Sequence, residues 1–132
     1  MIKNNSPLVL LHTKESRWIW DGHSIGWSLN QAKKTPIAVL FIHGFGANTR
    51  HWRHNQPVLG ETYSSYAIDL LGFGRSDQPK ARLRSEPDSG DAVHYGFELW
   101  GRQVSAFCQQ MIERPVVLVG NSIGGVVALR AA

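Results

Sequence analysis

The stretch Val119-Gly120-Asn121-Ser122-Ile123-Gly124 decides how this sequence folds. It places a serine between two glycines in the pattern G-x-S-x-G, which occurs where a sharp turn joins a strand to a helix. A side chain at either glycine would collide across so tight a turn, and the serine must adopt a strained backbone conformation. We therefore expect Ser122 at the apex of a turn, with its hydroxyl exposed as a nucleophile.

The residues on either side of this turn supply the strand and the helix. Residues 115–119 form a short run of apolar, mostly β-branched side chains, which is typical of a strand buried on both faces of a parallel sheet. Residues 125–132 begin with small side chains and contain no helix breaker, which predicts a closely packed helix. A G-x-S-x-G pattern that occurred by chance would not be expected between a strand and a helix of this kind.

Two further segments upstream repeat the pattern of a buried strand followed by a glycine-containing loop. Residues 36–42 form an apolar run that ends in His43-Gly44-Phe45-Gly46. Residues 66–68 form another, followed by Asp69 and by a turn that contains Gly72-Phe73-Gly74. Three such segments in this order favour an α/β domain with a mostly parallel sheet.

These blocks resemble the N-terminal half of an α/β-hydrolase-fold protein, most closely the pheophytinase-like branch of cyanobacteria and chloroplasts. Similar Trp, Asp and Gly positions also occur in the esterase, haloperoxidase and epoxide-hydrolase branches. The resemblance covers residues 17–132 and implies a partial domain, incomplete at its C-terminus, after an extension over residues 1–16. The matching blocks are residues 43–47, His51-Trp52-Arg53, residues 67–76, Leu99-Trp100 and residues 120–125.

The resemblance also implies roles for individual residues. Ser122 would be the nucleophile, and the backbone N–H groups of Phe45 and Ile123 would form an oxyanion hole. Four residues would support the elbow and the loop: His43, Gly44, Gly120 and Gly124. In this superfamily the acid and the histidine of the triad follow the nucleophile, but residues 123–132 contain no Asp, Glu or His. The isolated chain is therefore expected to be inactive.

Upstream residues are weak substitutes for the missing acid and base. His43 belongs to the oxyanion loop, where a loop-orienting role is favoured over that of a general base. Asp69 precedes a Gly-x-Gly turn and is expected to accept hydrogen bonds from nearby backbone N–H groups. His94 follows a long loop and is expected to be an exposed loop residue; Asp77 could only nominally serve as an acid.

The remaining elements can be placed by pattern. Residues 18–20 and 24–29 read as an antiparallel hairpin at the sheet edge, joined by Asp21-Gly22-His23. A short helix is expected over residues 49–55, capped by Asn48 or Thr49 and disturbed by Pro57. The spacing of Phe97, Trp100, Val104, Phe107, Met111 and Ile112 predicts an amphipathic helix whose aromatic stripe belongs to the core. Residues 77–94 form a long irregular stretch, either a mobile surface loop or a substrate-contacting flap.

Composition excludes several other classes. The chain has 132 residues, fewer than the ~200 to 250 that the implied fold usually needs as one domain. Its 14 basic residues exceed its 10 acidic ones but are dispersed, which disfavours nucleic-acid binding. The single Cys108 excludes an internal disulfide. The apolar run at residues 8–11 is shorter than a signal or membrane-spanning segment, so a soluble, cytoplasmic protein is expected.

No cofactor is expected. His51 and His54 lack a third metal ligand nearby, and neither Gly44-Phe45-Gly46 nor Gly72-Phe73-Gly74 has the third glycine of a dinucleotide loop.

Two hypotheses about function remain. The first is a serine hydrolase that cleaves an ester in a largely apolar small molecule, which the resemblance suggests is chlorophyll-derived. The second is a catalytically silent fragment that needs a C-terminal partner half, because its strand at residues 116–119 would otherwise form an exposed apolar sheet edge.

Overall fold

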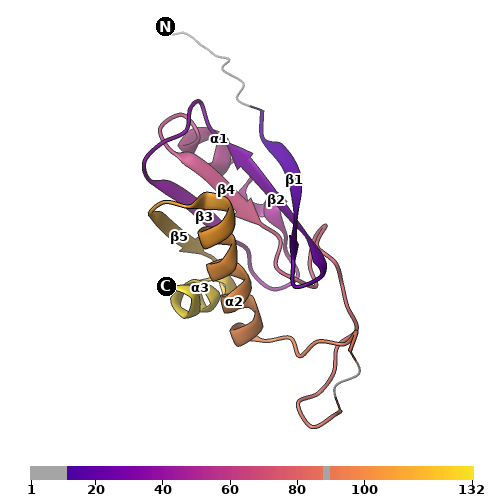
Figure 1. Cartoon of the computed structure of the whole chain (residues 1–132). Coiled ribbons are helices and arrows are strands. Elements are labelled where there is room, and N and C mark those ends of the chain that lie inside the picture. Colours follow the sequence, from indigo (N-terminus) through magenta and orange to yellow (C-terminus); the bar gives the residue numbers. More distant parts are fainter. Residues whose placement is uncertain (1–11, 88–89) are drawn as a thin grey trace, which may run out of the picture.

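A computed structural model describes residues 12–87 and 90–132 and shows a five-stranded sheet with helices on both faces (Figure 1). The strand order is β1-β2-β4-β3-β5. β3 is parallel to both of its neighbours, whereas β2 is antiparallel to β1 and to β4. The strands are β1 (Lys14–Trp20), β2 (His23–Asn30), β3 (Ala38–Ile42), β4 (Ser64–Ile68) and β5 (Val116–Gly120).

The predicted hairpin at the sheet edge is confirmed, with longer strands than expected. Asp21 and Gly22 both have positive φ angles, 50° and 78°, as a two-residue turn between antiparallel strands requires. His23, expected in the turn, is the first residue of β2 and pairs with Trp20. The apolar run at residues 8–11 lies outside the described residues, and the division between extension and domain at residue 16 stays a prediction.

Each face of the sheet has its own apolar core. On one face, Leu40 and Ile68 of the central strands pack with the buried residues of α2 (Phe97–Phe107) and with Val127 of α3 (Ile123–Ala131). On the other face, Phe41 stacks on Trp52 with ring centroids 4.6 Å apart. Strands β3 and β4 are buried throughout, as predicted for strands covered on both sides.

The prediction of one short helix over residues 49–55 was wrong. The structure has a single 3₁₀ turn, η2 (Thr49–Trp52), and a separate helix α1 (Asn55–Leu59). The Asn48 side chain caps η2 by accepting a hydrogen bond from Arg50 N at 2.8 Å. Pro57 does not end α1, because it lies in the first turn, where its missing N–H has no intrahelical partner to lose.

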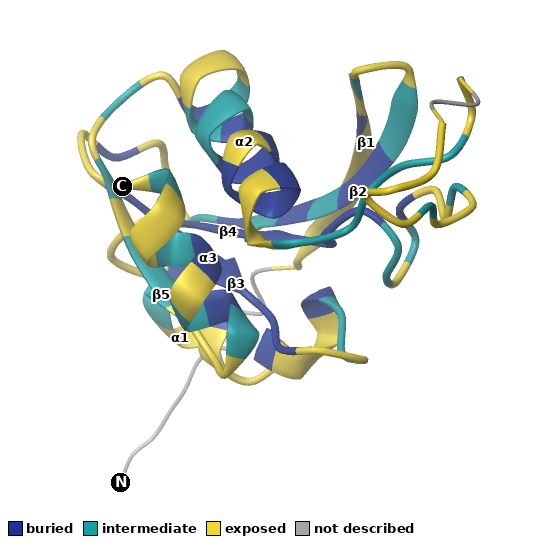
Figure 2. Ribbon diagram, turned by 90° about the horizontal axis from the view of Figure 1, so that it is seen from below, coloured by how far each residue is buried: buried dark blue, intermediate teal, exposed yellow. Residues whose placement is uncertain are grey.

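The amphipathic helix predicted around residues 97–112 is confirmed, with a change of hydrogen bonding near its end. Its apolar stripe includes the buried residues Trp100, Val104, Phe107 and Ile112, while Phe97 remains 42% exposed. Figure 2 shows buried residues along one side of α2 and exposed ones along the other. The last turn, η3 (Cys108–Ile112), is a π-helix that ends at Glu113 with φ at 59°. Periodicity alone did not indicate this bulge.

Strand β5 forms one edge of the sheet. It pairs with β3, and among the described residues nothing pairs with its other side. Val117 is 53% exposed, so the expectation of burial on both faces is not met in this chain. Within the ranges described, every helix falls short of the length and apolar character needed to cross a membrane.

Candidate active site

Ser122 occupies a sharp turn between β5 and α3, as predicted. Its φ of 59° and ψ of −124° lie in a region that non-glycine residues rarely adopt. The surrounding packing makes this conformation obligatory: a Cβ added at Gly120 would overlap the backbone of Gly124, and one added at Gly124 would overlap the carbonyl of Ile42. Asn121 N also donates to the Ile42 carbonyl at 3.1 Å, so β3 and the turn are locked together.

The loop after β3 lies directly beside this turn. A Cβ at Gly44 would be 3.2 Å from Ser122 Cβ, which leaves room for little more than hydrogen at this position. The Gly44 carbonyl accepts a hydrogen bond from Ala47 N at 3.1 Å, which closes the loop. The structure thus brings together the two segments that the sequence analysis assigned to one site.

Two backbone N–H groups in these adjacent segments, those of Phe45 and Ile123, are unpaired among the described residues. Ile123 is the first residue of α3, where an amide has no intrahelical acceptor. Within the described part of the chain, neither Ile123 N nor Phe45 N donates a hydrogen bond to a backbone or side-chain acceptor. Unpaired N–H groups of this kind are what a developing negative charge on oxygen requires.

His43 is fully buried and uses both ring nitrogens. Leu70 N donates to its Nε2 at 3.0 Å, so the ring proton is on Nδ1, which donates to the Gly44 carbonyl at 2.7 Å. Burial lowers the pKa of His43, and the hydrogen bond to Gly44 and the nearby Asp69 carboxylate only partly oppose this. The ring therefore ties the loop at Gly44 to the end of β4 and has no free nitrogen to accept a proton from Ser122.

Asp69 is also fully buried and anchors two loops. Its Oδ1 accepts from Thr49 N at 2.7 Å and its Oδ2 from Arg75 N at 3.1 Å. The predicted role of Asp69 as an acceptor for backbone N–H groups is thus confirmed. It extends to Thr49, the first residue of the separate turn η2. Sequence reasoning missed Gln103, whose side chain accepts from Leu71 N at 2.9 Å and donates to the Asp69 carbonyl at 3.1 Å. A polar residue inside the apolar stripe of α2 was the available signal.

A match to a protein-family model identifies the family of this chain. Residues 39–132 match the family model described as "Alpha/beta hydrolase family". The chain belongs to the alpha/beta hydrolase family. The sheet and helices described above are an incomplete alpha/beta hydrolase fold, with the elbow and the adjacent loop in the places that the sequence predicted.

Individual members of the family are similar to this chain over part of their length. Chloroplastic pheophytinase of Arabidopsis thaliana is 34% identical over 70% of this chain and 23% of its own length. The rat 1-acylglycerol-3-phosphate O-acyltransferase ABHD5 is 34% identical over 89% of the chain and 31% of its own length. The crystal structure of a bacterial membrane phospholipase A, a virulence factor, has a TM-score of 0.73 at 30% identity, covering 90% of this chain and 34% of that one. The chain thus spans 23% to 34% of the length of these proteins.

An apolar pocket of about 420 Å³ opens beside the loop that contains Phe45. Phe45 is 75% exposed and packs edge-on against Phe73, with ring centroids 5.4 Å apart. Trp100 and Tyr95 form another part of the wall, so the aromatic stripe of α2, assigned to the core from its periodicity, serves both core and pocket. Pro79 and Ala81 contribute from the long loop, so this loop takes part in the wall.

The residues described here offer no partner to the Ser122 hydroxyl. No side chain in residues 12–87 or 90–132 makes a hydrogen bond to its Oγ. His94 lies on the long loop, with its Nδ1 3.3 Å from the Arg82 carbonyl. Burial raises the pKa of the Cys108 thiol to about 11, so this cysteine is protonated at neutral pH and is no alternative nucleophile.

Proposed function

We propose that this chain carries the nucleophile and oxyanion hole of a serine hydrolase that cleaves carboxylic esters of largely apolar molecules. One observation carries the proposal: Ser122 is held at φ 59° in a turn that packs against Gly44, the neighbour of Phe45. Such strain persists only where the surrounding structure enforces it, and here the glycines of the turn do so. We propose that the unpaired amides of Phe45 and Ile123 face the oxygen of the substrate carbonyl.

The proposed reaction proceeds through an acyl-enzyme. Ser122 Oγ loses its proton to a base and attacks the ester carbonyl, and the carbonyl electron pair moves onto oxygen, where the Phe45 and Ile123 amides stabilise it. Collapse of this intermediate breaks the bond to the alcohol, which leaves with a proton from the same base. Water then adds to the acyl group by the same steps and releases the acid and free Ser122.

The base and its orienting acid are proposed to come from a C-terminal half that packs against β5. The relatives named above extend well beyond the length that the chain matches. Strand β5 has an open edge, and Val117, Val126 and Leu129 are 53%, 44% and 81% exposed beside it. An apolar edge of this kind favours pairing with further strands.

The apolar pocket beside Phe45 supports the proposed substrate class. Its aromatic walls suit an acyl chain or a ring system, and the phospholipase and pheophytinase relatives bear names that involve large apolar molecules. A chlorophyll-derived ester is the substrate that we propose on the pheophytinase likeness. One solved haloalkane dehalogenase and one solved epoxide hydrolase are 22% and 18% identical and support the fold alone. A haloperoxidase-like or epoxide-hydrolase-like activity is the second candidate function.

Labelling with a fluorophosphonate probe tests whether Ser122 is a nucleophile. It is carried out on this chain and on a longer protein that also contains a C-terminal half. We expect modification of Ser122 in the longer protein, abolished in Ser122→Ala and retained in the matched variant Ser105→Ala, which alters a half-buried serine of α2. The isolated chain should react about 10³-fold or more slowly, because it lacks the base. Equal, rapid labelling of the isolated chain would refute the requirement for a second half. Undiminished labelling or activity in Ser122→Ala would refute the nucleophile.

A further inference from the structure

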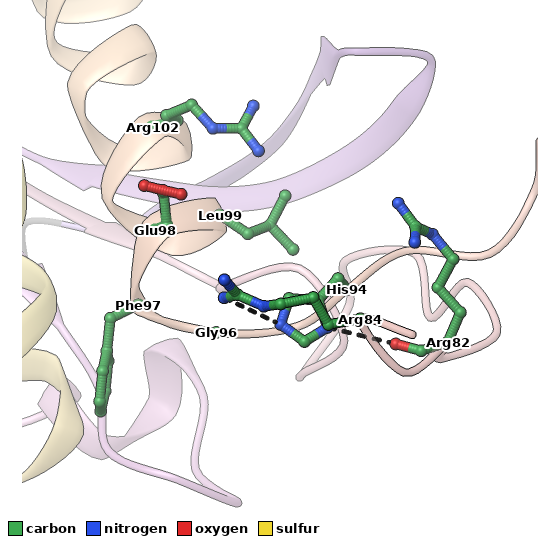
Figure 3. Close-up of a pocket in the computed structure, with 8 residues that line it drawn as sticks. All are labelled: Arg82, Arg84, His94, Gly96, Phe97, Glu98, Leu99 and Arg102. Carbon is green, nitrogen blue, oxygen red and sulfur yellow. Dashed lines mark hydrogen bonds between the residues drawn. The ribbon is translucent and has the colours of Figure 1, made fainter. Parts of the chain in front are cut away.

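A second pocket lies where the long loop meets the start of α2, and its charged lining is unlike that of the apolar pocket. It has a volume of about 290 Å³. Arg82 and Arg84 reach it from the loop and Arg102 from α2, with His94 between the two loop arginines (Figure 3). Three arginine side chains around one small pocket concentrate positive charge there, which favours an anionic ligand.

The charges of these arginines are not balanced by nearby carboxylates. In residues 12–87 and 90–132, no carboxylate lies within 4 Å of the guanidinium of Arg82, Arg84 or Arg102. Glu98 also lines the pocket, but its carboxylate pairs with Arg130 at 3.3 Å. The pocket therefore has an excess of positive charge.

Hydrogen bonding leaves one donor of the pocket lining without an acceptor, while Nη1 of Arg82 donates to the Glu86 carbonyl at 3.5 Å. Nε of Arg82 is buried and has no acceptor among the described residues. The His94 ring positions Arg84: an Arg84 amino group lies 3.5 Å from His94 Nε2, and His94 Nδ1 faces the Arg82 carbonyl at 3.3 Å (Figure 3). A buried donor without an acceptor costs free energy, which a bound oxyanion would recover.

The start of α2 adds to this excess. Gly96 precedes the helix and offers no side-chain cap, so the amides of the first turn have no acceptor from the capping residue. Both Gly96 and Leu99 line the pocket, which places the positive end of the helix dipole against it.

We propose that this arginine pocket binds a phosphate monoester group, either on a soluble molecule or as the head group of a lipid. Phosphate carries a charge of about −1.5 to −2 at neutral pH and three acceptor oxygens, which matches several guanidinium groups better than a single carboxylate does. The site adjoins the apolar pocket, because Ala81, Tyr95 and Trp100 of that pocket are the sequence neighbours of Arg82, Gly96 and Leu99. Binding there does not depend on the chemistry at Ser122.

Binding is tested on the Ser122→Ala form of the full chain, so that hydrolysis cannot interfere. Titration calorimetry with glycerol 3-phosphate tests a soluble ligand, and flotation with vesicles containing phosphatidic acid tests a lipid head group; phosphatidylglycerol vesicles of equal charge control for a diester. The variant Arg84→Ala/Arg102→Ala should weaken binding of the preferred ligand by about tenfold or more. The control Lys33→Ala/Lys34→Ala removes the same charge from exposed positions and should leave it unchanged.

Each outcome decides the proposal. Selective binding of glycerol 3-phosphate assigns a soluble ligand, and selective binding of phosphatidic acid vesicles assigns a lipid. Circular dichroism confirms that the variants are folded. No binding of either probe by the parent chain would overturn the proposal, as would equal losses in the arginine and lysine variants, since these would mean that net charge alone attracts the anion.

Discussion

Gly44 and Ser122 are in van der Waals proximity, with 3.2 Å between a Cβ built on Gly44 and Ser122 Cβ. The loop after β3 and the turn at Ser122 are thus positioned by one another as well as by the sheet. Backbone geometry at one of them cannot change without displacing the other, and this coupling makes the glycines of the site sensitive to the smallest substitution.

Gly124→Ala should destabilise the chain by about 3 kcal/mol, because the new methyl group would overlap the carbonyl groups of Ile42 and His43, which belong to the backbone and cannot rotate away. Gly125→Ala is the matched control. Its Cβ would lie 3.8 Å from the Gly120 carbonyl oxygen, an ordinary contact, and alanine favours the helix, so we expect unchanged stability or a gain of up to about 1 kcal/mol. Urea unfolding measures both. Equal stabilities of the two variants would contradict the close packing of Gly124 against the end of β3.

Asp69→Asn should cost about 2 to 3 kcal/mol, because asparagine has one acceptor oxygen for the two backbone donors at Thr49 and Arg75 and turns an NH₂ group toward the other. Asp77→Asn provides a comparison at an exposed carboxylate that accepts from Ser24 N, where we expect a loss below about 1 kcal/mol. Unfolding midpoints compare the two variants. A larger loss in Asp77→Asn would show that Asp69 is not the main anchor.

His43 should make folding stability depend on pH. Burial lowers its pKa below the ordinary value of 6.5, so near and below that pH the unfolded chain binds more protons than the folded one. The stabilisation that the buried, neutral His43 ring provides is therefore complete above pH 6.5. It is lost as the pH falls toward the pKa of this ring in the folded chain. In His43→Gln, stability should be lower at neutral pH and its decline below pH 6.5 shallower. His54→Gln, at an exposed position, should keep the parent slope, measured by urea unfolding across this range. An unchanged slope in His43→Gln would contradict the buried neutral ring.

The variant Phe45→Ala should distinguish the effect of the backbone amide of residue 45 from the effect of its aromatic ring. The amide remains, so kcat of the complete hydrolase should change little, whereas KM for long-chain esters should rise several-fold as the pocket loses an exposed aromatic wall. Short-chain esters serve as the internal control, because they do not reach the ring. Steady-state kinetics with p-nitrophenyl esters of increasing chain length measure this. A loss confined to kcat would mean that the ring, not only the amide, acts on the transition state.

The parts of the fold that could be predicted are those with a local cause. The turn at Ser122, the hairpin turn at Asp21 and Gly22, and the buried runs of β3 and β4 follow from the residues themselves. The helix after Asn48 was predicted at the correct start, because the cap is a local hydrogen bond. The local pattern did not contain the break before Asn55, nor the packing of Trp52 at the end of η2 against Phe41 of a different segment.

The supporting network of the site was predictable only in part. Asp69 was expected to bind nearby amides, and it does so at Arg75, but its second partner, Thr49, comes from a separate loop. The link from Gln103 to Leu71 likewise joins α2 to the loop after β4. Such long-range hydrogen bonds leave no periodic trace in the sequence.

The contact between Gly124 and the end of β3 also bears on how the nucleophile forms during folding. Ile42 pairs with Gly120 across the sheet, and these residues are far apart in the chain. The segment around Ser122 cannot adopt its strained conformation from local interactions, because the carbonyl groups that constrain it arrive with β3. Long-range pairings of this kind close large loops and form slowly. We therefore expect the turn at Ser122 to reach this conformation only after β3 and β5 have paired.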